Sequence, residues 1–172
     1  KLIQPKIDEV INRSKQKKSD IIVILDQVTD PNNIGSIIRS CALFNCKSVI
    51  VSKDNAPELN ANIAKAASGA LEIVNYISVV NLSRTIVKFK KNNYWIYGFD
   101  SSSNSSEKII NIAKKSILVF GSEGKGLRNL TKKECDALIS IPMEKQKKYN
   151  LDSLNVSNAC SIALFEHFKK NG

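Results

Sequence analysis

Short apolar runs alternate with helix-like segments along most of the chain, and this alternation constrains the fold more than any other feature. The run Ile21-Ile22-Val23-Ile24-Leu25 contains no polar residue, as expected for a strand buried on both faces of a parallel sheet. A βαβα series of this kind predicts an α/β fold with a mostly parallel sheet flanked by helices. The other predicted strands are residues 48–51, 73–76, 94–98, 117–120 and 137–141, and the predicted helices are a segment after a turn at 30–35 and residues 60–67, 82–91 and 156–168.

The chain divides into a short N-terminal segment and one longer domain. Residues 1–19 are polar and rich in Lys, with apolar residues at helical spacing, so we expect a linker or an amphipathic helix. Residues 20–172 contain no internal repeat or linker and are expected to form one domain. Because the chain begins with Lys1 rather than Met, we expect that a segment precedes it.

Charge and cysteine usage narrow the class of protein. The chain has 26 basic and 16 acidic residues and a formal net charge of +10, which favours a polyanionic partner. No apolar stretch reaches about 18 residues, so a membrane-spanning helix is not expected. Four scattered cysteines and the single His167 argue against a disulfide framework and against a metal site. The cysteines indicate reduced thiols in a cytoplasmic protein, and the surroundings of Cys41 and Cys160 suggest packing rather than reactivity.

A glycine-rich turn, residues 121–126, follows the predicted strand at 117–120 and is a candidate ligand loop. Its glycines allow the backbone to approach a ligand closely. The turn is not a P-loop, since Gly126 follows Lys125 where a P-loop requires Ser or Thr. Its late position and spacing also differ from the dinucleotide-binding fingerprint. A tight surface turn is the alternative interpretation.

Two further polar segments each precede a predicted helix. In the first, Asn33 can cap the helix and Gly35 allows a close approach, while free backbone N–H groups and Arg39 favour an anion such as phosphate. In the second, Ser153 or Asn155 can cap the last helix. Ordinary helix caps are the alternative interpretation of both segments.

Taken in order, these segments resemble the motifs of the SpoU/TrmH branch of the SPOUT RNA methyltransferases. The first motif is Asp26-x-Val28-x-Asp30-Pro31-x-Asn33-x-Gly35-x-x-x-Arg39. The second is Leu118-Val119-Phe120-Gly121-Ser122-Glu123-Gly124-x-Gly126-Leu127, and the third is Ile141-Pro142-Met143 followed by Ser153-Leu154-Asn155-Val156-Ser157-x-Ala159. The resemblance spans about residues 20–168. Residues 53–69 further resemble the subgroup that methylates a guanosine ribose in large-subunit ribosomal RNA.

The resemblance implies a fold, a cofactor and an assembly that composition does not reveal. It implies a deep trefoil knot at the C-terminal end of the sheet, a homodimer, and S-adenosylmethionine bound by the knot loops. The segment between Met143 and Ser153 is longer than is usual in the family, and the N-terminal RNA-binding domain found in many subgroup members is absent from these residues. The implied cofactor-binding residues are Gly121, Ser122, Glu123, Gly124, Gly126, Ile141, Pro142, Met143, Leu154 and Asn155.

The implied reaction is methyl transfer from S-adenosylmethionine to a ribose 2′-hydroxyl of structured RNA, with a guanosine in large-subunit rRNA as the expected target. Arg39 is expected to support a developing alkoxide electrostatically, because a guanidinium pKa of about 12.5–13.8 makes general-base action demanding. In the first motif, Asp26 and Asp30 are the acids that could act as a base instead. The implied catalytic residues are Arg39, Asn33, Glu123, Ser153 and Asn155.

Three lysines between the two cofactor segments are expected to contact the RNA backbone together with Arg39. They are Lys145, Lys147 and Lys148, and a solvated surface loop is the alternative interpretation. We expect rRNA rather than tRNA as the partner. A tRNA ribose 2′-O-methyltransferase and a non-catalytic RNA-binding factor with the same fold are the alternative functions, while the missing P-loop argues against an NTPase.

Overall fold

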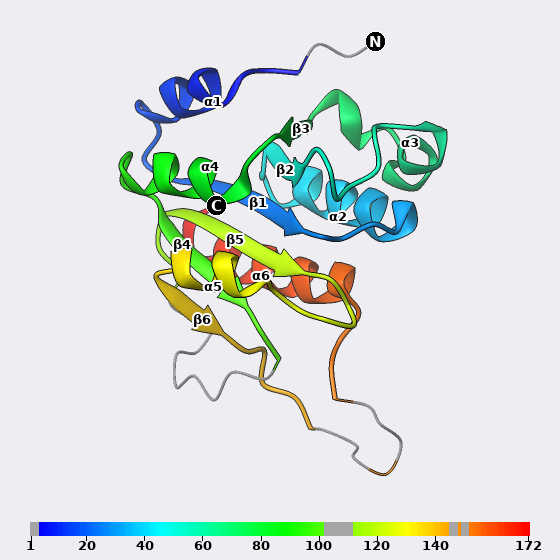
Figure 1. The fold of residues 1–172 in the computed structure, drawn as a ribbon. Coiled ribbons are helices and arrows are strands. Elements are labelled where there is room, and N and C mark those ends of the chain that lie inside the picture. Colours follow the sequence, from blue (N-terminus) through cyan, green and yellow to red (C-terminus); the bar gives the residue numbers. More distant parts are fainter. Residues whose placement is uncertain (1–3, 102–111, 145–147, 149–151) are drawn as a thin grey trace.

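The sheet is parallel throughout and forms the centre of the molecule. The computed structural model describes residues 4–101, 112–144, 148 and 152–172. Within these residues the six strands follow the order β3-β2-β1-β5-β4-β6, and every pairing is parallel (Figure 1). The predicted α/β class is therefore confirmed. The strands are β1 (Asp20–Asp26), β2 (Ser48–Ser52), β3 (Asn75–Val79), β4 (Trp95–Phe99), β5 (Lys115–Gly121) and β6 (Ala137–Ile139).

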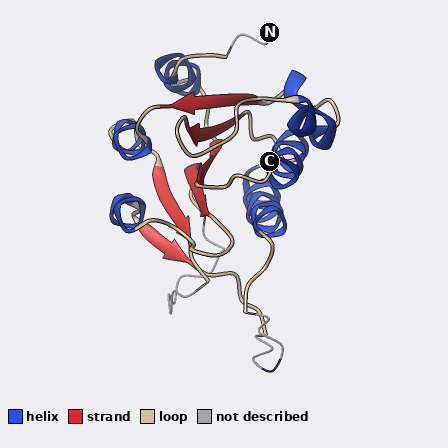
Figure 2. Cartoon of the chain, turned by 45° about the vertical axis from the view of Figure 1, so that its right-hand side comes forward, coloured by secondary structure: helices blue, strands red, loops and turns tan. Residues whose placement is uncertain are grey.

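Helices cover both faces of the sheet, which explains why the middle of each central strand is apolar on both sides (Figure 2). One face carries α1 (Ile7–Ser14), α4 (Leu82–Lys90) and α5 (Asn129–Glu134). The other carries α2 (Pro31–Leu43), α3 (Ala61–Ala67), the short 3₁₀ helix η1 (Ala70–Glu72) and α6 (Val156–Asn171). Along β1 the side chains divide between the two layers: Val23 packs in the α2 layer and Ile24 in the α4 layer.

The start of α2 differs from the prediction. We predicted a turn over residues 30–35 with Asn33 as the cap, but the helix already begins at Pro31. Asp30 is the cap, and its side chain accepts a hydrogen bond of 3.1 Å from the Asn32 backbone N–H. Pro31 fits the first helical position because its missing N–H has no partner to lose there. Asn33 consequently lies inside the first turn, where its side chain is available for other contacts.

Other element boundaries also differ from the prediction. Strand β3 begins at Asn75, two residues after the predicted start, because Ala70–Glu72 form a helical turn that the apolar pattern did not reveal. Helix α5 was not predicted, since its sequence is mostly polar. The predicted serine-rich loop at 101–106 lies largely outside the described residues.

The buried cysteines of α2 and α6 are packing groups. Cys41 and Cys160 are fully buried, which confirms the predicted packing role. Burial raises the pKa of the Cys41 thiol, and also that of Cys46, well above the ordinary range. Thiols in this environment stay protonated and unreactive.

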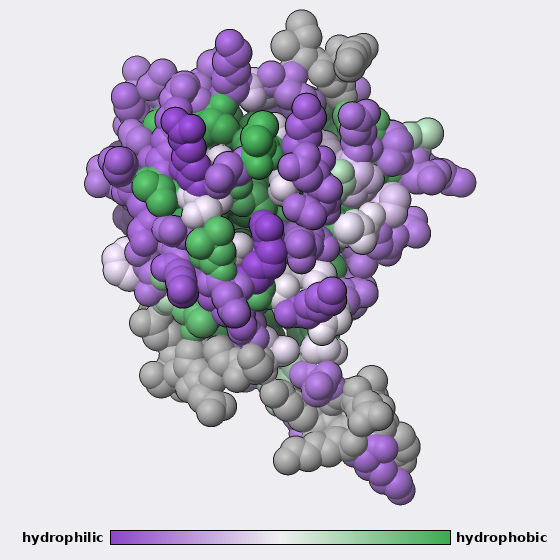
Figure 3. All heavy atoms as spheres, viewed as in Figure 1, coloured by the Kyte–Doolittle hydropathy of each residue, from purple (hydrophilic) through white to green (hydrophobic). Residues whose placement is uncertain are grey.

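The molecular surface seen in Figure 3 is largely hydrophilic, with separate apolar areas between charged side chains. In the part of the chain that the structure describes, no helix combines the length and apolar character needed to cross a membrane.

Candidate functional site

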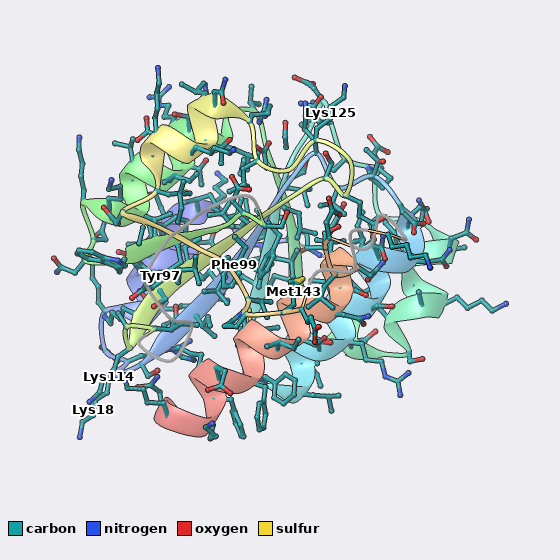
Figure 4. All side chains as sticks on the ribbon, turned by 90° about the horizontal axis from the view of Figure 1, so that it is seen from below. Lys18, Tyr97, Phe99, Lys114, Lys125 and Met143 are labelled. Carbon is teal, nitrogen blue, oxygen red and sulfur yellow. The ribbon has the colours of Figure 1, made fainter. Side chains whose placement is uncertain are left out.

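A pocket of about 300 Å³ opens at the carboxyl ends of β4, β5 and β6. Three chain segments form most of its walls: residues 121–126 after β5, residues 139–143 at the end of β6, and residues 152–154 before α6. The carboxyl edge of a parallel sheet is where ligands bind in open α/β folds. Figure 4 shows Phe99 and Met143, both lining residues, near the middle of this edge, with Lys125 at its outer margin.

Two aromatic rings give the pocket an apolar wall. Phe99 ends β4 and Phe120 lies near the end of β5, and their rings stack with centroids 4.5 Å apart and an interplanar angle of 16°. Both side chains are almost fully buried. A flat apolar surface of this kind suits a planar heterocycle.

The glycine-rich turn closes tightly on itself. Ser122 and Gly126 form an antiparallel bridge, and the Gly126 N–H donates a hydrogen bond of 2.8 Å to the Ser122 carbonyl. A Cβ atom on Gly121 would lie 2.1 Å from the carbonyl carbon of Gly126. Only glycine at position 121 therefore permits this turn. The close approach that we predicted toward a ligand is made here to the turn's own backbone, as the alternative interpretation of a tight turn requires.

An ion pair holds the end of the turn against β1. Asp26 is fully buried, and its carboxylate accepts hydrogen bonds from Arg128 at Nε (2.7 Å) and at the backbone N–H (3.1 Å). Arg128 Nη2 lies 2.7 Å from the same carboxylate. Asp26 is thus committed to this contact and Asp30 to its helix cap, so neither acid is placed as a general base. Lys could not replace Arg128 here, because an ammonium group cannot supply the two guanidinium nitrogens, Nε and Nη2, that contact the Asp26 carboxylate.

Three predicted catalytic side chains meet beside the pocket in one hydrogen-bonded cluster. Asn155 Nδ2 donates to Glu123 Oε1 at 2.6 Å and to Asn33 Oδ1 at 3.0 Å. Asn33 Nδ2 in turn donates to Glu123 Oε1 at 3.3 Å. The cluster joins α2, the glycine-rich turn and the start of α6, which are separated by 90 and 32 positions in the sequence.

The same cluster fixes the start of α6. Asn155 is the helix cap, as predicted for Ser153 or Asn155, and its Oδ1 accepts a hydrogen bond of 2.9 Å from the Ser157 N–H. The Val156 N–H points at Glu123 Oε1 at 3.4 Å. A carboxylate at a helix N-terminus is electrostatically favourable. The amides and the carboxylate therefore have a structural role in addition to any chemical one.

Most of the residues predicted to bind a cofactor line the pocket. Pro142 and Asn155 do not line it and are exposed. Lining residues that the sequence did not mark come from the ends of β4 and β6, from α5 and from the segment before α6. The predicted residues found in the lining are Gly121, Ser122, Glu123, Gly124, Gly126, Ile141, Met143 and Leu154, together with Ser153; those missed include Phe99, Asp100, Lys132, Ile139 and Asp152.

Arg39 lies apart from the pocket. It is exposed on α2, and its side chain makes no hydrogen bond or ion pair with any described residue. We predicted that Gly35 allows a ligand to approach closely, but the close neighbour is α3. A Cβ atom on Gly35 would lie 2.3 Å from the Ala66 Cβ. Of the three predicted RNA-binding lysines, Lys145 and Lys147 lie outside the described residues, and Lys148 is exposed. Within the described ranges, no cluster of His, Cys, Asp and Glu side chains has the arrangement of a metal site.

Comparisons with known proteins agree with this architecture. Residues 20–165 match the model of the SpoU rRNA Methylase family. The chain is 39% identical over 146 residues to the 23S rRNA (guanosine-2'-O-)-methyltransferase RlmB of Xylella fastidiosa, covering 85% of this chain and 57% of that protein. It is 40% identical over 146 residues to RlmB of Neisseria meningitidis, with the same coverage.

A solved structure shares the fold. The SpoU methyltransferase AviRb of Streptomyces viridochromogenes, in complex with the cofactor AdoMet, superposes with a TM-score of 0.80 at 24% identity, covering 96% of this chain and 62% of that one. The chain thus spans somewhat more than half the length of the curated relatives described here. From the family match over most of its length and the relatives' identities, we conclude that this chain belongs to the SpoU rRNA methylase family.

Proposed function

We propose that this chain is the catalytic domain of an S-adenosylmethionine-dependent RNA methyltransferase, acting on a ribose 2′-hydroxyl of a guanosine in large-subunit rRNA. The observation that carries the proposal is the pocket at the carboxyl edge, bordered by the Asn33–Glu123–Asn155 cluster. The relatives' names supply the substrate class, and the net charge of +10 suits an RNA partner. A cytoplasmic location fits this substrate and the reduced, buried thiols.

The pocket fits the proposed cofactor in size and chemistry. The stacked Phe99 and Phe120 rings offer an apolar wall for adenine, and the glycine-rich turn exposes backbone groups for hydrogen bonds. Ile141 and Leu154 would cover the adenine from the facing loops, with Met143 beside them. When bound, the cofactor supplies an electrophilic methyl group on a sulfonium.

The chain's own residues would position the acceptor. Asn155 uses both of its amide N–H groups within the cluster, on Glu123 and on Asn33, and so holds the Asn33 side chain in place. Asn33 donates one N–H to Glu123, which leaves its second N–H fixed for a hydrogen bond to a ribose. Arg39 would stabilise negative charge developing on the 2′-oxygen. Because Asp26 and Asp30 are already engaged, we infer that the proton leaves to a group on the RNA, such as a phosphate.

A trefoil knot would bring the three pocket loops together. Strand β6 lies at the sheet edge beside β4, whereas α6, which follows it, packs on α2 and β5. The two described ends of the connection between them, residues 139–143 and 152–154, both line the pocket at the carboxyl edge, next to the glycine-rich turn. We infer that the connection passes through the loop that joins β5 to β6. Experimental coordinates for residues 140–155 test this, and a path around the outside of that loop would contradict it.

A homodimer would use the outer face of α6. Ile162, Phe165 and Phe168 are 37%, 46% and 39% exposed, and Leu43 at the end of α2 is 68% exposed. Phe44 packs its ring against Phe165 and Phe168, with centroids 5.9 Å away in both cases. Together these side chains form a continuous apolar area, which is unusual for a monomer surface.

The position of Arg39 supports a second copy as the occupant of this face. Leu43 follows Arg39 by four positions on α2, so the two residues share a helix face and Arg39 borders the apolar area. The neighbouring Ser40 lies 2.7 Å from Ser161 of α6, oxygen to oxygen. A dimer would hold Arg39 at the boundary between two copies. We expect Phe165→Glu to convert a dimer to a monomer in sedimentation velocity. Val80→Glu, at a 78% exposed site away from α6, is the matched control. A monomeric parent chain, or a dimeric Phe165→Glu variant, contradicts this assembly.

Isothermal titration of the chain with S-adenosylmethionine and with ATP tests the proposed function. We expect saturable binding of S-adenosylmethionine, because both the apolar wall and the backbone groups of the pocket suit adenosine. ATP should give no comparable signal, because the protein has no P-loop to bind the triphosphate. Absence of S-adenosylmethionine binding at saturating concentration would refute the proposal.

A further inference from the structure

A second, open pocket of about 630 Å³ lies on the other side of the glycine-rich turn. It shares Ser122, Gly124 and Lys125 with the first pocket, so a single turn of chain separates the two. The remaining lining follows β1 and β2 at the same carboxyl edge: Gln27, Thr29, Asp54, Asn55 and Ala56. Two ligands bound in these pockets would lie against one another across the turn.

The backbone at the mouth of this pocket is unusual. Gln27 has φ of 63°, a left-handed conformation that few residues other than glycine adopt. Residues in this region persist only where their surroundings hold them, and they gather at functional sites. In the described part of the chain the Gln27 side chain has no hydrogen-bond partner, although it is half-buried. Its amide is available to a ligand in the pocket.

The Asp54 carboxylate is exposed and stabilises no helix or turn among the described residues. It makes no ion pair or hydrogen bond with any described residue. It does not cap α3, because Asn60 accepts the hydrogen bonds from the Asn62 and Ile63 N–H groups at 3.0 and 3.1 Å. In a protein with a net charge of +10 that binds RNA, a carboxylate here would repel phosphate. Its placement makes sense if it faces a base rather than the backbone.

The neighbouring groups complete a donor and acceptor pattern. Asn55 uses its Nδ2 on Ser52 Oγ at 3.3 Å, which leaves its side-chain oxygen to accept. Lys125, also exposed, offers an ammonium donor. Guanine presents two adjacent donors, N1–H and N2–H₂, beside the O6 acceptor. A carboxylate matches the two donors, and an ammonium or amide donor matches O6. Adenine presents an acceptor at N1, which a carboxylate repels.

We propose that this second pocket holds the base of the acceptor nucleotide, and that Asp54 selects guanine by accepting from N1–H and N2–H₂. The assignment rests on the proposed function and names the pocket and the residue that select its guanosine. It makes Asp54 a specificity-determining residue. Sites built to pair with particular polar groups reject analogues that lack them, because the site's own groups are then left unpaired.

Mononucleotide titrations test this selection in the full chain saturated with S-adenosylhomocysteine. We expect the parent chain to bind 5′-GMP at least about tenfold more tightly than 5′-AMP, with 5′-IMP intermediate because it lacks the 2-amino group. Asp54→Asn should weaken 5′-GMP binding about ten- to hundredfold, because a hydrogen bond to a charged group is lost. Glu58→Gln removes an exposed charge on the same loop but outside the pocket, and should preserve the preference.

The titrations distinguish failure of the guanine pocket from failure of the proposed function. If the parent chain binds S-adenosylhomocysteine but binds 5′-GMP and 5′-AMP equally or not detectably, the guanine pocket alone is overturned. An unchanged preference in Asp54→Asn overturns the role of that carboxylate. Absence of S-adenosylhomocysteine binding by the parent chain overturns the proposed function and this inference together.

Discussion

Gly121→Ala is expected to abolish binding of S-adenosylmethionine. The added Cβ would lie 2.1 Å from the Gly126 carbonyl carbon and 2.3 Å from both its oxygen and the Leu127 nitrogen. These are backbone atoms that no rotamer change can move, so the turn must open. We expect a loss of about 3 kcal/mol or more in the free energy of unfolding, at the upper end for overpacked sites. Calorimetric titration and urea unfolding measure the two effects.

Gly124→Ala is the matched control for stability. It places the same methyl group in the same turn, but a Cβ at this position meets no atom within 4 Å. Its free energy of unfolding should therefore stay within about 0.5 kcal/mol of the parent value. Parent-like stability and cofactor affinity in Gly121→Ala would show that the observed turn does not shape the pocket.

Arg39→Lys is expected to slow methyl transfer by about 10²–10³-fold, the range seen when one donor to a developing oxyanion is removed. Lys keeps the positive charge but loses the planar fork of the guanidinium. Cofactor affinity should be unchanged, because Arg39 does not line the cofactor pocket. Single-turnover rates with saturating RNA, together with a cofactor titration, separate the two quantities.

Arg84→Lys is a suitable control for that experiment. Arg84 is also exposed on a helix, but α4 covers the opposite face of the sheet. The same substitution there should leave the rate unchanged. A parent-like rate in Arg39→Lys would remove the guanidinium from the chemistry, whereas a loss of cofactor affinity would mean that the pocket extends to α2.

The sheet could be predicted because its strands are buried on both faces. The run Ile21–Leu25 has no polar residue, and such a run has few other places in a fold. The tight turn at 121–126 could also be predicted from the sequence, because its glycines indicate where the backbone comes close to other atoms. Helix starts were harder to predict, because Asp30 and Asn33 are both good caps. Pro31 favours the first helical position, and this makes the preceding residue, Asp30, the cap.

Contacts between distant residues could not be predicted from local pattern. The Asp26–Arg128 ion pair spans 102 positions, and only the pairing of β1 with β5 brings its partners together. The aromatic wall has the same origin, because Phe99 and Phe120 are register neighbours on β4 and β5. The Asn33–Glu123–Asn155 cluster could be predicted only through the family resemblance. The resemblance also grouped Arg39 with these residues, but within a single chain Arg39 does not line the pocket beside them.

The identity of the acceptor atom is the most direct test of the proposed reaction. The methylated nucleotide is first located by mass mapping of large-subunit rRNA incubated with the protein and S-adenosylmethionine. Two RNAs are then compared that are identical except for a single 2′-deoxy substitution at that nucleotide. A ribose 2′-O-methyltransferase methylates the ribose form fully and leaves the deoxy form unmethylated. Methylation of the deoxy form would place the methyl group on a base atom and contradict the assignment of a ribose 2′-O-methyltransferase.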